Sequence, residues 1–152
     1  AVKKGNLTEK DILIVMDLIR KVKPHQIFVA GDLADPHGTH KVCLNAALAA
    51  IDELKKEGIM DECRVWMYRG AWAEWEIDHI EMAVPISPEQ LLNKRKSILR
   101  HQSQMESAPF MGNDERLFWQ RAEDRNRATA SLYQQLGLAS YEAIEAFVEY
   151  KF

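Results

Sequence analysis

Cysteine is scarce in this sequence, and long apolar runs are absent from it. The 152 residues include two cysteines, Cys43 and Cys63, and neither lies in a C-x-x-C pattern. We therefore expect a reduced protein of the cytoplasm with both thiols buried. No apolar run approaches the roughly 18 residues that a membrane-spanning helix needs, and the first residues, AVKKGNLTEKD, contain no apolar core of a signal peptide. These absences argue against a disulfide framework, a membrane protein and a secreted one.

A long block of one charge sign is also missing. The formal net charge is −3, and charged residues make up 28% of the chain. This balance gives no electrostatic support to nucleic acid or a membrane surface as a partner. Hydrophobic residues make up 47% of the chain, which is enough for a core, so we expect a single domain over residues 1–152.

An initiator methionine is absent as well. The chain opens on a short polar stretch that contains two lysines. We expect these residues to be the C-terminal part of a longer polypeptide.

The apolar residues recur with helical and strand periods in turn. Helices are expected over residues 8–22, 39–57, 87–101 and 113–137, and strands over residues 26–31, 63–70, 79–86 and near 141–151. Thr8 with Asp11, and Ser87 with Gln90, fit capping boxes at two helix starts. This order predicts an α/β fold, a Rossmann-like layered domain with a mostly parallel sheet flanked by helices.

The helical period also predicts which faces are buried. The expected inner faces of the second and fourth helices are Cys43, Ala47, Leu48, Ile51 and Leu54, and Phe118, Ala122, Thr129, Leu132 and Leu136. The segments NKRKS and ERLFWQRAEDRNRA carry charges at helical spacing, and we interpret both as solvated surface.

The segment GDLADPHGTH follows the apolar run QIFVA, at the carboxyl end of a predicted strand. Ligands bind at such ends in open α/β sheets. His37 and His40 are three residues apart, so one helical turn places both imidazoles near one small ligand, and Asp32 or Asp35 can complete or orient a metal-ligand set. The alternative is a polar loop with exposed histidines, in which Thr39 caps the following helix.

Three segments in order resemble the PIG-L or LmbE-like deacetylases. VAGDLADPHGTHKV is similar to the family's D-P-H-x-x-H motif, KSILRHQSQ to its lysine-led helix ending in H-x-S-Q, and YEAIEAFVEY to its closing segment. The resemblance covers nearly the whole chain from Asp32 onward. These enzymes depend on zinc and remove acetyl groups from N-acetylglucosaminyl compounds.

The resemblance implies roles for individual residues. It makes His40 a zinc ligand, and it makes His37 the group that stabilises the oxyanion or donates a proton, with Asp35 as the other candidate catalytic residue. In this scheme a zinc-bound water attacks the acetyl carbonyl. His101 would lie near the site as a supporting, substrate-binding residue; the alternative is a cation at a helix end, where the dipole favours it.

One family motif is missing from the chain. The deacetylases begin with a strand ending in H-P-D-D, which supplies a histidine and an aspartate to zinc and a second aspartate as general base. Here His25 and His79 are followed by Gln26 and Ile80, so one of three family ligands is present. The chain is either a piece that lacks the family's first strand or a descendant that lost catalysis, and its abrupt start favours the first. We expect zinc to be absent or weakly bound by this chain alone, and we expect self-association or contact with a missing N-terminal part.

The segment RGAWAEWE follows a predicted strand and has the composition of a sugar site. Arg69, Trp72 and Trp75 are candidate substrate-binding residues, since aromatic faces pack against pyranose rings and arginine binds phosphate through two parallel hydrogen bonds. The alternative is a loop whose tryptophans pack on neighbouring helices or at a subunit interface.

The stretch from YRGAWAEW to RHQSQ resembles the LmbE-like C-terminal region attached to some bacterial glucosamine-6-phosphate deaminases. Two functions follow. One is a carbohydrate-active hydrolase, a zinc-dependent deacetylase of an N-acetylglucosamine-type amino sugar when the domain is whole. The other is a non-catalytic domain that binds an amino sugar or sugar phosphate and regulates an attached deaminase. Nothing in the 152 residues shows the deaminase active site itself.

Overall fold

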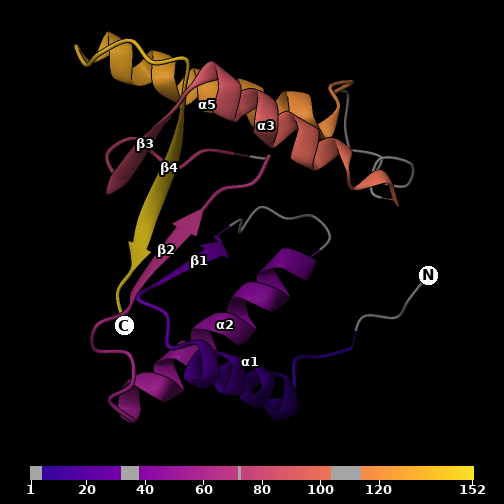
Figure 1. The fold of residues 1–152 in the computed structure, drawn as a ribbon, viewed down its shortest axis with the longest axis vertical. Helices are drawn as coiled ribbons and strands as arrows, with labels where there is room; N and C mark the ends of the chain where they lie inside the picture. The colour runs from indigo at the N-terminus through magenta and orange to yellow at the C-terminus, as the bar shows by residue number, and fades with distance from the viewer. Residues whose placement is uncertain (1–4, 32–37, 72, 104–113) are drawn as a thin grey trace. The chain divides into compact units, whose positions relative to one another are not determined.

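The computed structural model describes residues 5–31, 38–71, 73–103 and 114–152. The chain divides into two compact units, Ala1–Tyr68 with Val148–Phe152, and Arg69–Phe147. Four strands form one sheet in the order β1-β2-β4-β3. Figure 1 shows the helices and strands with the labels used below.

The first unit contains two helices and a parallel strand pair. Its elements are α1 (Glu9–Val22), β1 (Gln26–Ala30), α2 (Thr39–Lys56), β2 (Arg64–Tyr68) and the last residues of β4 (Ala143–Tyr150). The parallel register of β1 and β2 sets Phe28 opposite Trp66. An ion pair of 2.9 Å between Arg64 Nε and Glu149 Oε1 joins β2 to β4.

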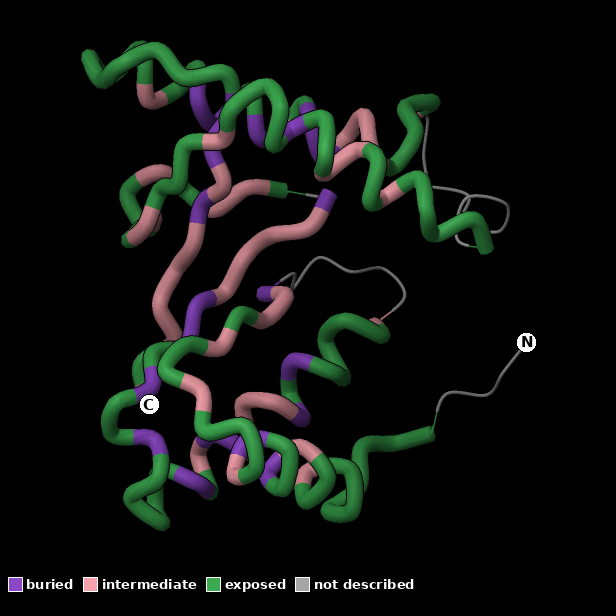
Figure 2. The backbone as a smooth tube through the Cα atoms, in the orientation of Figure 1, coloured by how far each residue is buried: buried purple, intermediate pink, exposed green. Residues whose placement is uncertain are grey.

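Aliphatic side chains of α1, α2 and β2 form the core of this unit. Ile51, Leu54 and Val65 are completely buried, and buried positions recur along one side of α2 (Figure 2). The full cluster consists of Met16, Ile19, Ala50, Ile51, Leu54, Met60, Cys63 and Val65. The helices are therefore fixed to the strands by burial of apolar surface.

Local signals in the sequence set the ends of the helices. The capping box predicted at Thr8 is present, because the Thr8 backbone N–H donates to Asp11 Oδ2 at 2.9 Å. The N-cap of α2 is Gly38 and not Thr39, which is already the first helical residue. Gly38 adopts a φ of 69°, a left-handed conformation that glycine reaches without steric cost.

The second unit pairs two helices with an antiparallel strand pair. It contains β3 (Met82–Ile86), α3 (Pro88–Leu99), α5 (Phe118–Gln135) and most of β4. Strands β3 and β4 are antiparallel, with Pro85 opposite Ile144. β3 is an edge strand, where proline is tolerated because its missing N–H faces outward. The predicted capping box of Ser87 and Gln90 is present at the start of α3.

The predicted α/β fold is confirmed, with three differences in detail. The sheet is mixed, because β3 runs antiparallel to β4. β3 begins at Met82 because residues 77–79 form a turn, closed by a 2.9 Å hydrogen bond from His79 N–H to the Glu76 carbonyl. Residues 114–117 are not helical, and α5 begins at Phe118.

The buried faces of the two long helices differ from the predicted ones. In α2, Cys43 is exposed and Leu44 is buried. In α5, Phe118, Leu132 and Leu136 are exposed; the buried residues are Ala122, Glu123, Asn126, Thr129 and Ala130. Lys94 of α3 and Glu145 of β4 are among the hydrogen-bond partners of this polar face. None of the helices in the described part of the chain is long and apolar enough to cross a lipid bilayer.

Candidate functional site

The predicted metal-binding segment lies between β1 and α2. His40 is the second residue of α2, in its first turn, and is exposed to solvent. Asp32, Asp35 and His37 fall outside the described residues, so their predicted roles stay predictions. The carboxyl end of β1 and the start of α2 are thus the part of this segment whose structure is described.

A zinc site requires three or four protein ligands in tetrahedral arrangement. Within the described ranges, no group of three histidine, cysteine, aspartate or glutamate side chains is close enough to hold a metal ion. His40 is the one residue of the predicted H-x-x-H pair in this part of the chain. The described residues by themselves therefore do not make a zinc site.

Two of the predicted substrate-binding residues come together in the second unit. The guanidinium carbon of Arg69 lies 4.2 Å from the ring centroid of Trp75, which is a cation–π contact. Both residues are half-buried. The indole Nε1 of Trp75 is buried and has no hydrogen-bond partner among the described residues. Trp72 lies outside the described residues.

His101 lies just after the C-cap of α3 and is exposed. Its Nδ1 is 3.0 Å from the Ser97 carbonyl oxygen, one of the last carbonyls of the helix. This contact fits the helix-end alternative for His101. Its predicted role in substrate binding stays a prediction.

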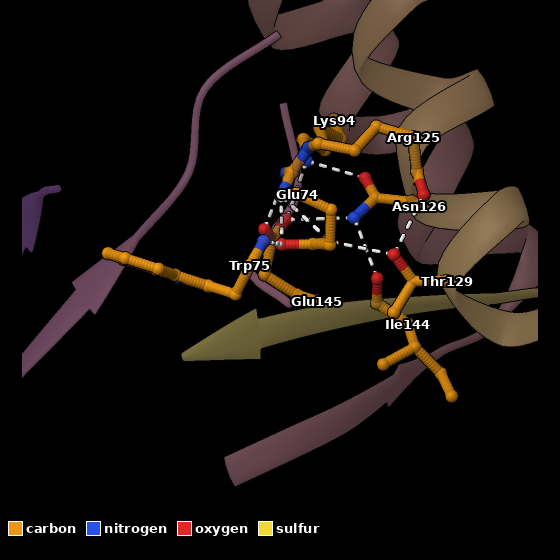
Figure 3. A network of polar contacts seen from close by, with 8 residues as sticks. All are labelled: Glu74, Trp75, Lys94, Arg125, Asn126, Thr129, Ile144 and Glu145. Carbon is orange, nitrogen blue, oxygen red and sulfur yellow. Dashed lines mark hydrogen bonds and ion pairs between the residues drawn. The ribbon is translucent and has the colours of Figure 1, made fainter. Parts of the chain in front are cut away.

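A network of charged and polar side chains extends from the Trp75 loop to α3, α5 and β4 (Figure 3). Glu74 accepts hydrogen bonds from Thr129 Oγ1 at 2.7 Å and from Arg125 Nη1 at 3.2 Å. It also accepts one from the backbone N–H of Trp75 at 3.0 Å. Both oxygens of this carboxylate are thus bound by donors of the network.

Arg125 connects Glu74 to a second carboxylate, Glu145 of β4. Its Nη2 lies 2.6 Å from Glu145 Oε1, and its side chain is 7% exposed. Burial alone would raise the pKa of Glu145, but the charges and hydrogen bonds of Arg125 and Lys94 outweigh it, so this pKa lies below its ordinary value. The carboxylate is therefore held in its charged form.

Lys94 and Asn126 complete the network on the side of α3. Lys94 Nζ donates to Glu145 Oε2 and to Asn126 Oδ1, each at 2.7 Å. Asn126 is completely buried, and its Nδ2 donates to the Ile144 carbonyl at 2.8 Å. Two carboxylates and two cations make the network electrically balanced, which limits the cost of burying it.

The interpretation of NKRKS and ERLFWQRAEDRNRA as solvated surface is wrong for Arg125, whose side chain is 7% exposed, and for Asn126, which is completely buried. It is also wrong for Glu123, whose side chain is 6% exposed and forms an ion pair of 2.5 Å with Arg95. The partners of α5 lie far away in sequence, so charge spacing within the helix does not reveal them. The available signal was the run of small and polar residues at Ala122, Asn126 and Thr129, which share one side of the helix.

Comparison with known proteins identifies one curated relative with high similarity. The chain is 72% identical over 151 residues to a glucosamine-6-phosphate deaminase-like protein of Bacteroides thetaiotaomicron. The match covers 98% of this chain and lies in the C-terminal part of that protein. The chain spans 23% of the relative's length. No known protein-family profile matches the sequence.

Three solved structures share the fold at low sequence identity. The 4-carboxy-2-hydroxymuconate hydratase of Pseudomonas putida superposes with a TM-score of 0.67 at 14% identity, over 97% of this chain and 60% of the hydratase. A conserved protein of Thermus thermophilus gives a TM-score of 0.62 at 18% identity, over 94% and 59% of the two chains. The zinc-inhibited form of teicoplanin deacetylase gives 0.58 at 18% identity, over 99% and 57%.

These comparisons confirm the predicted resemblances at two levels. The structural neighbours include a deacetylase of the PIG-L/LmbE fold, and the sequence relative bears the name of a glucosamine-6-phosphate deaminase-like protein. At these identities the structures establish the fold alone. A hydratase and a deacetylase share this fold, so the reaction has to be argued from the site.

Proposed function

We propose that this chain is part of a carbohydrate-active hydrolase that removes the acetyl group from an N-acetylglucosamine-type amino sugar in a zinc-dependent reaction. The observation that carries the proposal is the position of His40. His40 is exposed in the first turn of α2, the helix that follows β1 in the chain, and the D-P-H motif ends three residues before it in the sequence. The segment between the carboxyl end of a strand and the next helix is where open α/β folds bind their ligands.

Two further observations support the proposal. The structural neighbours include a teicoplanin deacetylase, which supports the reaction type. The name of the sequence relative refers to a phosphorylated amino sugar, which supports the substrate class. His40 would act as a nitrogen ligand, with His37 and Asp35 as the candidate catalytic residues. Zinc, when bound, would supply an activated water and polarise the acetyl carbonyl.

Zinc binding by the intact natural polypeptide that contains these residues tests the proposal. We expect about one bound zinc per site by inductively coupled plasma mass spectrometry. His40→Ala should lose this zinc, because removal of one directly coordinating residue weakens a zinc site severely. His79→Ala is the matched control, since His79 is also exposed but lies in a turn of the other unit. Acetate release from N-acetylglucosamine and its 6-phosphate should fall with the zinc content.

The 152-residue chain alone should bind zinc weakly and release no acetate, because it contains one of the three ligands that the resemblance implies. Rapid deacetylation by this chain would contradict the prediction that its zinc-ligand set is incomplete. Unchanged zinc content in His40→Ala of the intact polypeptide would rule out His40 as a ligand.

A second candidate function is a non-catalytic domain that binds an amino sugar or sugar phosphate and regulates an attached deaminase. The stacked Arg69 and Trp75 favour it, because arginine beside an aromatic ring suits a phosphorylated sugar. Under this candidate, His40→Ala leaves zinc content and ligand affinity unchanged. Arg69→Ala instead lowers the affinity for glucosamine 6-phosphate, measured by calorimetry.

A further inference from the structure

Glu74 connects α5 to the loop that carries Arg69 and Trp75. Its carboxylate accepts hydrogen bonds from Thr129 Oγ1 at 2.7 Å and from Arg125 Nη1 at 3.2 and 3.3 Å. It also accepts a hydrogen bond from the backbone N–H of Trp75 at 3.0 Å. Contacts with the helix on one side and with the loop backbone on the other fix the point from which the Trp75 side chain departs.

These contacts are shielded from water. Thr129 is 2% exposed, and the side chains of Arg125 and Glu74 are 7% and 16% exposed. Hydrogen bonds to charged groups are short and strong, and a low local dielectric strengthens them further. The loop is therefore held at Glu74 by shielded hydrogen bonds to Arg125 and Thr129 of α5.

Trp75 extends away from the network, whereas Glu74 points into it (Figure 3). The guanidinium of Arg69 lies over the Trp75 ring at 4.2 Å. Stacking involves the flat face of a guanidinium, whereas phosphate oxygens bind to the N–H groups along its edge. Glu74 points toward α5 and pairs there with Arg125, so its charge repels an anion beside Arg69 less than an unpaired carboxylate would.

We infer that Arg125 and Thr129 are positioning residues, which act through Glu74 to set the Arg69–Trp75 pair for a phosphorylated amino sugar. Arg69 binds the phosphate, and Trp75 packs against the sugar ring. The choice of an amino-sugar ligand rests on the proposed function, whereas the positioning by α5 rests on the contacts of the second unit.

Calorimetric titration of the full chain with glucosamine 6-phosphate tests this inference, with glucosamine and inorganic phosphate as comparison ligands. The wild-type chain should bind glucosamine 6-phosphate more tightly than either. Thr129→Val keeps the shape of the side chain but removes the donor to Glu74, and it should weaken binding about tenfold. Thr129→Ser keeps the hydroxyl and should stay within about twofold of wild type. Ser131→Ala, at an exposed position of the same helix, is the matched control.

A double-mutant cycle separates positioning from a general loss of structure. Arg69→Lys keeps a charge but loses the planar fork, so residual binding can still be measured. If Thr129 acts through the Arg69–Trp75 pair, Thr129→Val should weaken binding much less in the Arg69→Lys background than in wild type. The near-ultraviolet circular dichroism of the tryptophans should change in Thr129→Val and return in Thr129→Ser.

The outcomes that overturn the inference are specific. Wild-type affinity in Thr129→Val, or equal losses in both backgrounds, would overturn the positioning role. Failure of the wild-type chain to bind glucosamine 6-phosphate would overturn the ligand class. The zinc content of His40→Ala, measured separately, decides the proposed deacetylase.

Discussion

The ammonium nitrogen of Lys94 lies 2.7 Å from a carboxylate oxygen of Glu145, and this contact joins α3 to β4. Arg125 of α5 binds the other oxygen of the same carboxylate at 2.6 Å. Three elements of the second unit therefore meet at one glutamate whose side chain is 17% exposed. The second unit is therefore stabilised both by ionic contacts among α3, α5 and β4 and by burial of its small apolar residues.

Replacing Glu145 with glutamine should destabilise the chain. Glu145→Gln leaves Arg125 and Lys94 without their shared counter-charge in a shielded place, and we expect a loss of about 3 kcal/mol in the free energy of unfolding. Urea denaturation followed by circular dichroism measures this loss. Glu142→Gln is the control, because Glu142 pairs with Arg127 at the surface, where an ion pair contributes less than about 1 kcal/mol. Equal losses in the two variants would contradict the structural importance of the Glu145 contacts.

The same carboxylate predicts how stability depends on pH. Burial works to raise the pKa of Glu145, but the stronger combined effect of Arg125 and Lys94 lowers it below the ordinary value. A group whose pKa is lower in the folded state contributes stability above its unfolded pKa of about 4.3, and loses it as the pH falls through the folded pKa. Between pH 7 and pH 3, the urea midpoint of the wild-type chain should thus fall more steeply than that of Glu145→Gln. Parallel curves would show that other carboxylates dominate.

The apolar core of the first unit allows a direct test of packing. Leu54 of α2 is completely buried in a cluster with residues of α1 and β2. Leu54→Ala should lower the free energy of unfolding by about 3 kcal/mol, through lost burial and the cavity left behind. Leu18→Ala removes the same atoms from a residue that is 59% exposed, and should change stability by less than about 0.5 kcal/mol. Comparable losses in both variants would place the core elsewhere.

The order and type of the elements were predictable because local chemistry determines them. Thr8 with Asp11 and Ser87 with Gln90 form the capping boxes that their spacing predicts. Gly137 ends α5 with a φ of +90°, as expected for a residue in the left-handed region. Each of these signals acts within a few residues of chain, so periodicity and turn chemistry suffice to find it.

The buried side of α5 was not predictable in the same way. Apolar periodicity favours Leu132 and Leu136, yet both are exposed. Asn126 and Thr129 can be buried because Glu145 and Glu74 accept hydrogen bonds from their side chains. Both of these partners come from segments distant in sequence. A pattern within one helix contains no information about such partners.

Part of the candidate site follows from spacing and part does not. The six-residue separation of Arg69 and Trp75 in a loop already places the two near each other, and the structure stacks them. The role of Glu74 as the connection to α5 depends on Arg125 and Thr129. These residues lie more than fifty positions further along the chain, beyond the reach of a local motif.

The two cysteines should differ in reactivity, contrary to the expectation that both are buried. Cys43 is exposed and Cys63 is buried, and burial raises the pKa of the Cys63 thiol. Since the thiolate is the reactive form, an aromatic disulfide reagent at pH 8 should modify one thiol rapidly and the second only in urea. Cys43→Ser should abolish the rapid phase, and Cys63→Ser should retain it. Two rapid phases in the native wild-type chain would show that Cys63 is accessible.

The edge of β1 is a candidate surface for self-association of the chain. β1 pairs with β2 and stands at one end of the strand order. Its sequence QIFVA contains no charge or proline of the kind that protects natural edges from pairing, and Phe28 at its centre is 49% exposed. We therefore expect the chain to self-associate at micromolar concentrations in sedimentation velocity.

Phe28→Lys should shift the chain toward monomer, because a lysine on an edge strand disfavours further pairing. Val22→Lys introduces the same charge at an exposed apolar position of α1 and should leave association unchanged. If both lysines act alike, apolar exposure in general drives association; if neither acts, the edge of β1 does not take part in it.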